Sequence, residues 1–262
     1  MGKLAYSARS DHKWFVVVDG KEEKKYDEIH SPIFNPDSKH LAYSVRSDHK
    51  WFVVVDGKEG KQYDETDRLV FSPDGKHLAY MARSGNKWFV VVDGKEKEQY
   101  DETNRPVFSP DGNHVAYAAR SGNKWFVVVD GKEGNRYNWV NELIFSPDGN
   151  HVAYAAISGH KWLVVVDCEE GNQYDLASGL VFSSDGKHLA YMAKSDNKWF
   201  VVVDKREKKQ FDKIDRPVFS PTINYVLYAA KSGNKWFVVV DGKEGNQYDD
   251  ILMTSGGGMI AF

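Results

Sequence analysis

The apolar run Trp-Phe-Val-Val-Val is the strongest hydrophobic signal in this chain. It lacks the alternation of apolar and polar residues that marks a half-buried strand, so we expect both of its faces to be buried. Its tryptophan returns every 37 residues, at Trp14, Trp51, Trp88, Trp125, Trp162, Trp199 and Trp236. An unbroken period of this length predicts a repeat architecture that runs through the whole chain.

Each repeat predicts four short strands, and the unit Arg68–Asn104 shows the pattern. Its strands are expected at 68–72, 77–83, 88–93 and 98–101, separated by the turns Pro-Asp-Gly, Ser-Gly-Asn and Gly-Lys-Glu. Proline and glycine at these places favour tight turns. Strands joined by tight turns must pair antiparallel, because a parallel pair needs a crossover of about a dozen residues or more.

We predict an all-β fold, a seven-bladed β-propeller of four-stranded antiparallel blades that forms one domain over residues 1–262. Radial stacking covers both faces of each blade, and known propellers have about 4–8 blades. The chain begins inside a unit, since Lys3-Leu-Ala-Tyr6 matches His77-Leu-Ala-Tyr80. We therefore expect residues 259–262 to form the missing first strand beside residues 3–9, which would close the ring with a blade built from both termini.

Composition narrows the function classes. A net charge of −3 argues against a nucleic-acid binder that relies on a basic face. No apolar run approaches the roughly 18 residues of a membrane span, and the repeat begins at once, so no signal peptide is expected. Cys168 is the single cysteine, which excludes an intrachain disulfide. We expect a monomer without a cofactor; the compartment is not indicated.

The motifs carry a family resemblance. Phe-Ser-Pro-Asp-Gly-Lys-His-Leu-Ala-Tyr at 71–80, followed by Val-Val-Val-Asp-Gly-Lys-Glu at 90–96, resembles the WD40-like propeller repeat of bacterial TolB-type proteins. The resemblance covers the whole chain and implies a binding platform. TolB-type propellers usually have six blades and an extra N-terminal domain, and true WD40 blades have a Trp-Asp ending and a Gly-His start. This chain has none of these features, so the resemblance implies no particular partner.

Three sets of residues recur around the predicted ring, and for each we favour a structural role. The tryptophans suit an inter-blade core better than a ring that stacks sugars or bases. The aspartates at the third-to-fourth strand turn suit turn capping better than metal binding; they are Asp19, Asp56, Asp93, Asp130, Asp167, Asp204 and Asp241. One slot holds His40, His77, His114, His151 and His188. Because Lys3 and Tyr225 also fill it, packing is favoured over catalysis.

The link between one blade's fourth strand and the next blade's first strand varies most. Binding residues concentrate on loops that a rigid scaffold holds. Trp139 stands where other repeats have mostly charged residues, and exposed aromatics are enriched in binding hot spots; the alternative is a ring lying flat on its own blade. Basic residues near the channel mouth would meet an acidic group or be solvated. The candidate binding residues are Trp139, Arg68, Arg105, Arg216, Glu142 and His30.

The same face carries a second basic ring at the second-to-third strand turns. Its members are Arg9, Arg46, Arg83, Arg120, Lys194 and Lys231, and Ile157 interrupts it.

No catalytic motif supports an enzyme, since the chain has neither a Gly-x-Ser-x-Gly elbow nor a His-Glu-x-x-His helix. We predict a non-enzymatic scaffold that binds a protein or peptide through the face of the inter-blade loops. One alternative is a site at the channel mouth that binds, and in one form of the hypothesis hydrolyses, a small molecule or glycan. The other is a recently amplified or engineered scaffold without a ligand.

Overall fold

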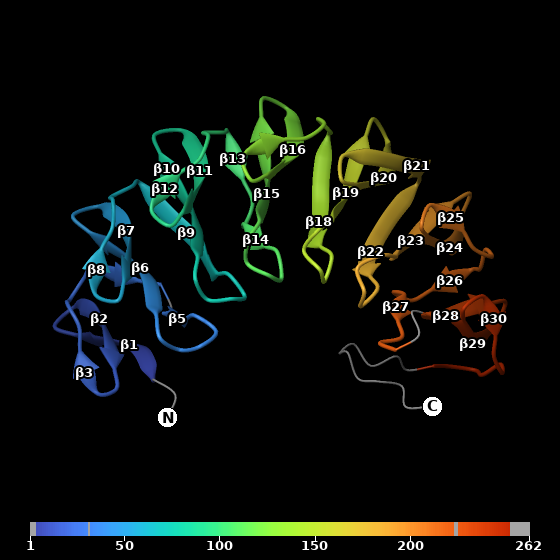
Figure 1. The fold of residues 1–262 in the computed structure, drawn as a ribbon, viewed down its shortest axis with the longest axis horizontal. Coiled ribbons are helices and arrows are strands. Elements are labelled where there is room, and N and C mark those ends of the chain that lie inside the picture. The colour runs from blue at the N-terminus through green and yellow to red at the C-terminus, as the bar shows by residue number, and fades with distance from the viewer. Residues whose placement is uncertain (1–3, 31, 223–224, 252–262) are drawn as a thin grey trace. The chain divides into compact units, whose positions relative to one another are not determined.

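The computed structural model describes residues 4–30, 32–222 and 225–251, and their regular structure is entirely β-strand. Those residues form seven antiparallel sheets, here numbered 1 to 7 in chain order. The chain divides into two compact units, unit 1 over Met1–Asn138 and unit 2 over Trp139–Phe262 (Figure 1). Unit 1 holds sheets 1 to 4 and unit 2 holds sheets 5 to 7. The prediction of an all-β fold is confirmed, and sheets 3, 5 and 6 have the predicted four antiparallel strands. Sheets 2, 4 and 7 have five because their first strand is in two pieces, and three strands of sheet 1 are described.

The strands of unit 1 follow one another along the chain, sheet by sheet. Sheet 1 consists of β1 (Ala5–Ser10), β2 (Lys13–Val18) and β3 (Lys21–Glu22). Sheet 2 consists of β4 (Glu28–Ile29), β5 (Ile33–Phe34), β6 (Leu41–Ser47), β7 (Lys50–Val55) and β8 (Lys58–Glu59). Sheet 3 consists of β9 (Glu65–Phe71), β10 (Leu78–Ser84), β11 (Lys87–Val92) and β12 (Lys95–Glu96). Sheet 4 consists of β13 (Glu102–Thr103), β14 (Val107–Phe108), β15 (Val115–Ser121), β16 (Lys124–Val129) and β17 (Lys132–Glu133).

Unit 2 repeats the same plan. Sheet 5 consists of β18 (Trp139–Phe145), β19 (Val152–Ser158), β20 (Lys161–Val166) and β21 (Glu169–Tyr174). Sheet 6 consists of β22 (Leu176–Phe182), β23 (Leu189–Ser195), β24 (Lys198–Val203) and β25 (Arg206–Glu207). Sheet 7 consists of β26 (Lys213–Ile214), β27 (Val218–Phe219), β28 (Val226–Ser232), β29 (Lys235–Val240) and β30 (Lys243–Glu244). The expected strand at 259–262 and its ring closure lie outside the described residues.

A proline decides whether the first strand of a sheet is continuous. Pro32, Pro106 and Pro217 stand where the first strands of sheets 2, 4 and 7 break into two pieces. Leucine fills this slot in sheets 3, 5 and 6, whose first strands are unbroken. Proline has no N–H to give to the ladder, so it interrupts pairing there. The continuous strands carry a bulge at the same place, as the register shift opposite Ala79–Met81 shows.

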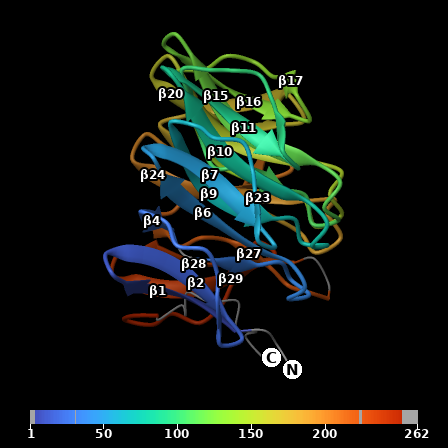
Figure 2. The same ribbon diagram turned by 90° about the vertical axis from the view of Figure 1, so that its left-hand side faces the viewer.

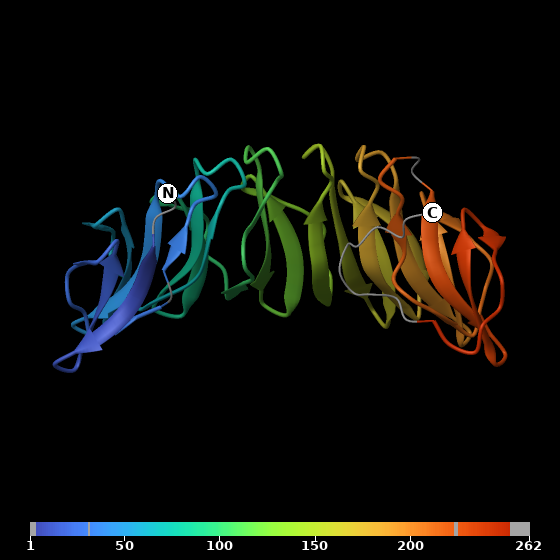
Figure 3. The ribbon, with the colours of Figure 1, turned by 90° about the horizontal axis from the view of Figure 1, so that it is seen from below.

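Within each unit, the hydrophobic core lies between successive sheets. Phe89 and Val91 of β11 pack in a cluster with Tyr63 of sheet 2, whereas Val90 packs in a cluster with Tyr117 of sheet 4. Alternate residues of one strand thus face opposite neighbours, as side chains in a strand do. The prediction that both faces of the Trp-Phe-Val-Val-Val strand are buried is confirmed. In Figure 2 the sheets of unit 1 are seen stacked one against the next, and Figure 3 shows the sheets of unit 2 side by side.

The aromatic contacts between sheets come from the fourth strand. Tyr100 of sheet 3 packs its ring 6.4 Å from that of Tyr117 and 5.4 Å from that of Phe126, both in sheet 4. The residues at the same repeat position in other sheets also pack on a phenylalanine of the following sheet; they are Tyr26, Tyr63, Tyr174 and Phe211. The tryptophans, for which we expected this role, contribute unevenly. Trp125 is buried, and Trp162 and Trp199 pack against core clusters between sheets. Trp88 is only half-buried, with Arg83 lying 5.7 Å from the centre of its ring. Trp88 lies at the end of the sheet, where the strand meets solvent.

Successive Ser-Pro-Asp-Gly turns nest against one another. Ser72 Oγ donates a hydrogen bond of 2.6 Å to Asp74 Oδ1, which holds the turn. A Cβ atom added to Gly112, in the next turn, would lie 2.5 Å from that same carboxylate oxygen. Gly112 also has a φ of +79°, which disfavours any L side chain. The glycine is therefore needed for the approach of neighbouring turns as well as for its own conformation.

In sheets 1, 2, 3, 5 and 6 an aspartate follows the fourth-strand aromatic and ties that sheet to the next. Asp64 accepts a hydrogen bond of 2.6 Å from Lys50 in its own sheet and another of 2.6 Å from the Gly85 N–H in sheet 3. These donors, Lys50 first, hold the pKa of the Asp64 carboxyl below its usual range. The pKa is lowered in the same way, with the lysine as the main cause, for Asp27, Asp101, Asp175 and Asp212.

Replacing the inter-sheet tyrosine should be costly. We expect Tyr100→Ala to lower the free energy of unfolding by about 3–5 kcal/mol, because truncation of a buried aromatic leaves a cavity. Tyr100→Phe should cost much less, since Phe211 fills the same slot in sheet 6. Urea unfolding of the three proteins measures the difference, and equal losses in both variants would contradict this account of the core.

The aspartate ties should make stability fall in acid. Their folded-state pKa lies below the unfolded value of about 3.9, so their contribution is complete above about pH 4. It is lost as the pH falls further, through the folded-state pKa. Thermal unfolding between pH 6 and pH 2 measures this, and Asp64→Asn/Asp101→Asn should show a shallower acid decline than the wild type. An unchanged decline would mean that these ties contribute nothing to it.

Candidate functional site

Three residues form a row across the end of each of sheets 2 to 7, on the side of the second-to-third strand turns. In sheet 3, Glu65 of the first strand lies opposite Arg83 of the second, and Arg83 lies opposite Trp88 of the third. Side chains directly opposite on neighbouring strands share one face and interact. We call these three positions the end row of a sheet.

The end rows of sheets 2 to 4 carry an ion pair. Arg83 Nη2 lies 3.0 Å from Glu65 Oε2, and Arg120 Nε lies 3.0 Å from Glu102 Oε2. Arg46 and Glu28 are paired in the same way. Each arginine also covers the tryptophan of its row, at 5.7 to 6.0 Å from the ring centre. The acidic and basic members cancel in charge, so these rows are neutral.

Sheet 5 replaces the ion pair by an apolar pair. Trp139 lies opposite Ile157, and Ile157 lies opposite Trp162, so the whole end row is apolar. Trp139 is 43% exposed and Ile157 is partly exposed. The prediction that Trp139 is exposed is confirmed. The interruption of the basic ring at Ile157 and the unusual Trp139 are therefore two halves of one feature.

The end rows of sheets 6 and 7 have no acidic residue. Leu176 lies opposite Lys194 in sheet 6, and Lys213 lies opposite Lys231 in sheet 7. Each second-strand lysine lies over its tryptophan, Lys194 at 5.6 Å from the Trp199 ring and Lys231 at 5.8 Å from that of Trp236. The first-strand position thus changes from glutamate throughout sheets 2 to 4 to Trp139, Leu176 and Lys213 in unit 2.

Four of the candidate binding residues share one repeat slot, in or beside the bulge of the first strand. They are Arg68, Arg105, Glu142 and Arg216, and Gly179 fills the slot in sheet 6. Arg68 and Glu142 have φ values of +57° and +52°, as a bulge with a left-handed residue requires. Arg68 Nε lies 3.4 Å from Asp67 Oδ2, and Arg105 is exposed between β13 and β14.

Glu142 and Arg216 meet on the sheet that lies between theirs. Glu142 Oε2 accepts hydrogen bonds from the backbone N–H groups of Gly179, at 2.6 Å, and Leu180, at 3.0 Å. Arg216 Nη2 donates to the Leu180 carbonyl oxygen at 2.9 Å. Both side chains thus support the bulge of sheet 6. The equal spacing of positions 142, 179 and 216 is the sequence signal that these residues occupy the same slot in successive sheets.

His30 belongs to unit 1, apart from the rows of unit 2. It is exposed, and its imidazole packs on Trp51 of its own sheet with ring centres 4.5 Å apart. The contact covers the tryptophan on the face of sheet 2.

The recurring histidines and aspartates pair with one another at the opposite end of the sheets. His77 Nδ1 lies 2.7 Å from Asp93 Oδ2, while Asp93 Oδ1 accepts the Leu78 N–H at 3.0 Å. The other pairs are His40–Asp56, His114–Asp130, His151–Asp167 and His188–Asp204. Each aspartate thus anchors the start of the second strand. Within the described residues no group of three His, Cys, Asp or Glu could hold a metal ion.

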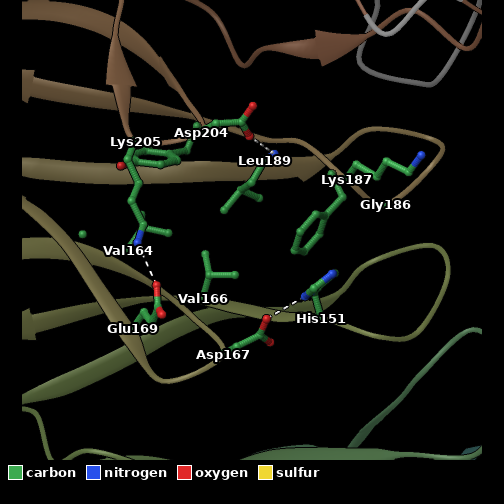
Figure 4. A pocket seen from close by; sticks show the side chains of 13 residues that line it. His151, Val164, Val166, Asp167, Glu169, Gly186, Lys187, Leu189, Asp204 and Lys205 are labelled. Carbon is green, nitrogen blue, oxygen red and sulfur yellow. Dashed lines mark hydrogen bonds and ion pairs between the residues drawn. The ribbon is translucent and has the colours of Figure 1, made fainter.

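A pocket of about 390 Å³ lies in unit 2 between sheets 5 and 6 (Figure 4). Its apolar lining consists of Val164, Val166, Phe182 and Leu189. Two polar pairs flank this lining, His151–Asp167 at 2.6 Å and Lys205–Glu169 at 3.0 Å. The second pair exists only because two turns differ from the repeat. Glu169 stands where other sheets have Lys or Arg, and Lys205 stands where all but one have Gly.

Comparison with known proteins relates the chain to β-propellers. TolB from Acinetobacter baumannii is 18% identical, with 79% of this chain and 62% of TolB covered and a TM-score of 0.38, so this chain spans less than two thirds of TolB. The propeller domain of the Trilobed protease from Pyrococcus furiosus is 14% identical, with 97% and 95% covered and a TM-score of 0.42. The periplasmic gluconolactonase of Pseudomonas aeruginosa is 17% identical, with 94% of both chains covered and a TM-score of 0.39.

No protein-family model matches the chain, and no curated protein matches it. The resemblance to TolB-type and other β-propeller proteins that the repeat indicated is thus found among solved structures, without a specific identity. No helix in the described part of the chain is long and apolar enough to cross a membrane.

Restoring glycine, the usual residue of the repeat, in two turns near the pocket should stabilise the protein. Cys168 and Lys205 have φ values of +68° and +65°, where other sheets have glycine. A left-handed conformation costs a non-glycine residue roughly 1–2 kcal/mol, and glycine loses roughly 0.5–1 kcal/mol more entropy on folding. We expect Cys168→Gly and Lys205→Gly each to raise the free energy of unfolding by about 0.5 kcal/mol.

Chemical denaturation measures these changes, and Gly242→Ala is the matched control, because Gly242 has a φ of +82° in the same slot. It should be destabilising. A loss of stability in both glycine variants would show that Cys168 and Lys205 are held by favourable contacts instead.

Proposed function

We propose that this chain is a non-enzymatic propeller scaffold that binds a protein or peptide through the end rows of sheets 5, 6 and 7. The observation that carries the proposal is the apolar pair Trp139–Ile157, which stands in place of the Glu–Arg ion pairs of sheets 2 to 4. Aromatic residues are enriched among the residues that dominate binding energy.

The fold gives no reason for the apolar pair. Trp139 and Ile157 lie in the same register as Glu65 and Arg83, so both kinds of pair close the same antiparallel sheet. An exposed tryptophan beside a partly exposed isoleucine forms an apolar surface where the other sheets offer charges to water. Contiguous exposed apolar surface on a soluble protein commonly marks an interaction site.

The proposal includes a closed ring of seven blades in one domain, for which the unbroken 37-residue period is the support. It treats the five His–Asp pairs as structural, because the second oxygen of each aspartate holds the N–H group that begins a strand. It places Glu142 and Arg216 beneath the binding surface, as supports of the bulge in sheet 6.

A double substitution separates binding from folding. Trp139→Glu/Ile157→Arg rebuilds the ion pair that sheets 2 to 4 carry, so the sheet should remain intact and the thermal midpoint should stay within a few degrees of the wild type. The apolar surface would be gone. We expect proteins from the source organism's extract that the wild type retains to be lost by this variant, as measured by quantitative mass spectrometry.

The control is Glu65→Ala/Arg83→Ala, which alters an end row of unit 1 and should leave retention unchanged. Equal retention by all three proteins would remove the end rows of unit 2 from the function. A small molecule that binds the wild type and the double variant alike would transfer the function to another site, with the pocket between sheets 5 and 6 as the next to test.

A further inference from the structure

We propose that the partner of the unit 2 end rows is an acidic peptide segment that carries one bulky apolar residue. This inference rests on the proposed function and adds the chemistry of the partner. It is drawn from the charges and apolar side chains that replace glutamate along the three rows.

Positive charge increases from row to row in unit 2. A glutamate and an arginine cancel in each row of sheets 2 to 4. The row of sheet 5 is uncharged, the row of sheet 6 carries the single charge of Lys194, and the row of sheet 7 carries the two charges of Lys213 and Lys231. The surface therefore runs from apolar at sheet 5 to basic at sheet 7.

Most of the other charged groups beside these rows form ion pairs. Lys161 lies 2.6 Å from Asp175, Lys198 lies 2.6 Å from Asp212, and Lys235 lies 2.6 Å from Asp249. Asp175 and Asp212 also accept the backbone N–H groups of Asp196, at 3.1 Å, and Gly233, at 2.7 Å. These carboxylates already have donors on both oxygens. Asp196, in the second-to-third strand turn of sheet 6, adds one negative charge beside the row of Lys194. The net positive charge of the surface is therefore concentrated at Lys213 and Lys231 of sheet 7.

Lys213 and Lys231 lie directly opposite each other on neighbouring strands. Like charges in this arrangement destabilise a sheet. The first-strand glutamates of sheets 2 to 4 show that the position accepts a carboxylate, which pairs there with the basic residue of the second strand. A carboxylate supplied by a partner between Lys213 and Lys231 would offset their repulsion and form two ion pairs.

The three rows succeed one another in space. The first strands β18 and β22 are in contact, as are β22 and β27, so sheets 5, 6 and 7 lie in sequence order (Figure 1). An extended peptide across them would place its apolar side chain on Trp139, Ile157 and Leu176 and its carboxylates over Lys194, Lys213 and Lys231. Complementary charge of this kind steers association and fixes orientation.

A peptide fits this surface better than a nucleic acid does. Only three lysines add net charge to the rows, and the carboxylates of Asp175 and Asp212 lie among them. A strand of phosphates would meet those carboxylates as well as the lysines. A peptide can instead carry its acidic groups only where the lysines lie.

Fluorescence anisotropy on the full chain tests the proposal with four labelled probes. The first peptide has one phenylalanine followed by six alternating aspartates and glutamates. The second has alanine in place of phenylalanine, and the third has lysines in place of the acidic residues. The fourth probe is a single-stranded oligothymidylate. We expect the first peptide to bind most tightly, by about tenfold over each of the others, with an affinity that falls as salt is added.

Two charge reversals of equal size locate the site. Lys213→Glu places a glutamate opposite Lys231, as in sheets 2 to 4, and should weaken the first peptide by roughly tenfold. Lys243→Glu makes the same change in net charge on an exposed residue at the other end of sheet 7 and should leave its affinity unchanged. Trp139→Glu/Ile157→Arg should remove the preference for phenylalanine over alanine.

The outcomes separate this inference from the proposed function. If the lysine peptide or the oligothymidylate binds as tightly as the first peptide and is weakened by Trp139→Glu/Ile157→Arg, the acidic partner is wrong and the surface stands. If the first peptide binds all variants equally, or if no peptide binds, both the acidic partner and the proposed binding surface are wrong. Sedimentation that shows a dimer dissociated by Trp139→Glu/Ile157→Arg would make a second copy of this chain the occupant, and would overturn the acidic peptide.

Discussion

The packing of one sheet's fourth-strand aromatic into the next sheet is the contact on which the rest of the structure depends. Tyr63, Tyr100 and Tyr174 are each buried against a tyrosine and a phenylalanine of the following sheet. Sheets 2, 3 and 6 therefore bury both faces against their neighbours. Stability in such a repeat is a sum of terms between neighbours. This explains why the Trp-Phe-Val-Val-Val strand and the alanines beside it hardly vary: each residue must fit two sheets at once.

The two ends of each sheet differ in how strongly contacts with neighbouring sheets restrict their residues. At one end, the Ser-Pro-Asp-Gly turns nest against one another and the His–Asp pairs anchor the second strands, so substitutions there disturb neighbours. At the other end, the first residue of each end row faces solvent and contacts the basic residue or isoleucine beside it. The fold accommodates Trp139, Leu176 and Lys213 at the position that holds glutamate in sheets 2 to 4, although Lys213 lies opposite the like charge of Lys231. A binding surface can be built where the scaffold tolerates change, and this end is such a place.

The bulge slot holds residues that support the fold of a neighbouring sheet. Glu142 is a candidate binding residue because it lies in the variable link between one blade and the next. Its carboxylate accepts two backbone N–H groups of sheet 6, and Arg216 donates to the same segment. A bulge leaves backbone groups without ladder partners, and buried groups of this kind need hydrogen bonds from elsewhere. The two charged side chains supply them.

The sequence by itself determined the strands, the turns, the period and the burial of both faces of the third strand. These follow from local patterns: runs of β-branched residues, glycine and proline at turns, and a spacing that never changes. The exposure of Trp139 could also be read there, since its slot otherwise holds mostly polar residues. The pairing of Trp139 with Ile157 could not, because the bulge shifts the register of β18 on β19 and a shift of one residue exchanges the faces of a strand. Only the tertiary structure decided that pairing, the packing of the fourth-strand aromatics between sheets, and the meeting of Glu142 and Arg216, since each joins strands that the sequence separates.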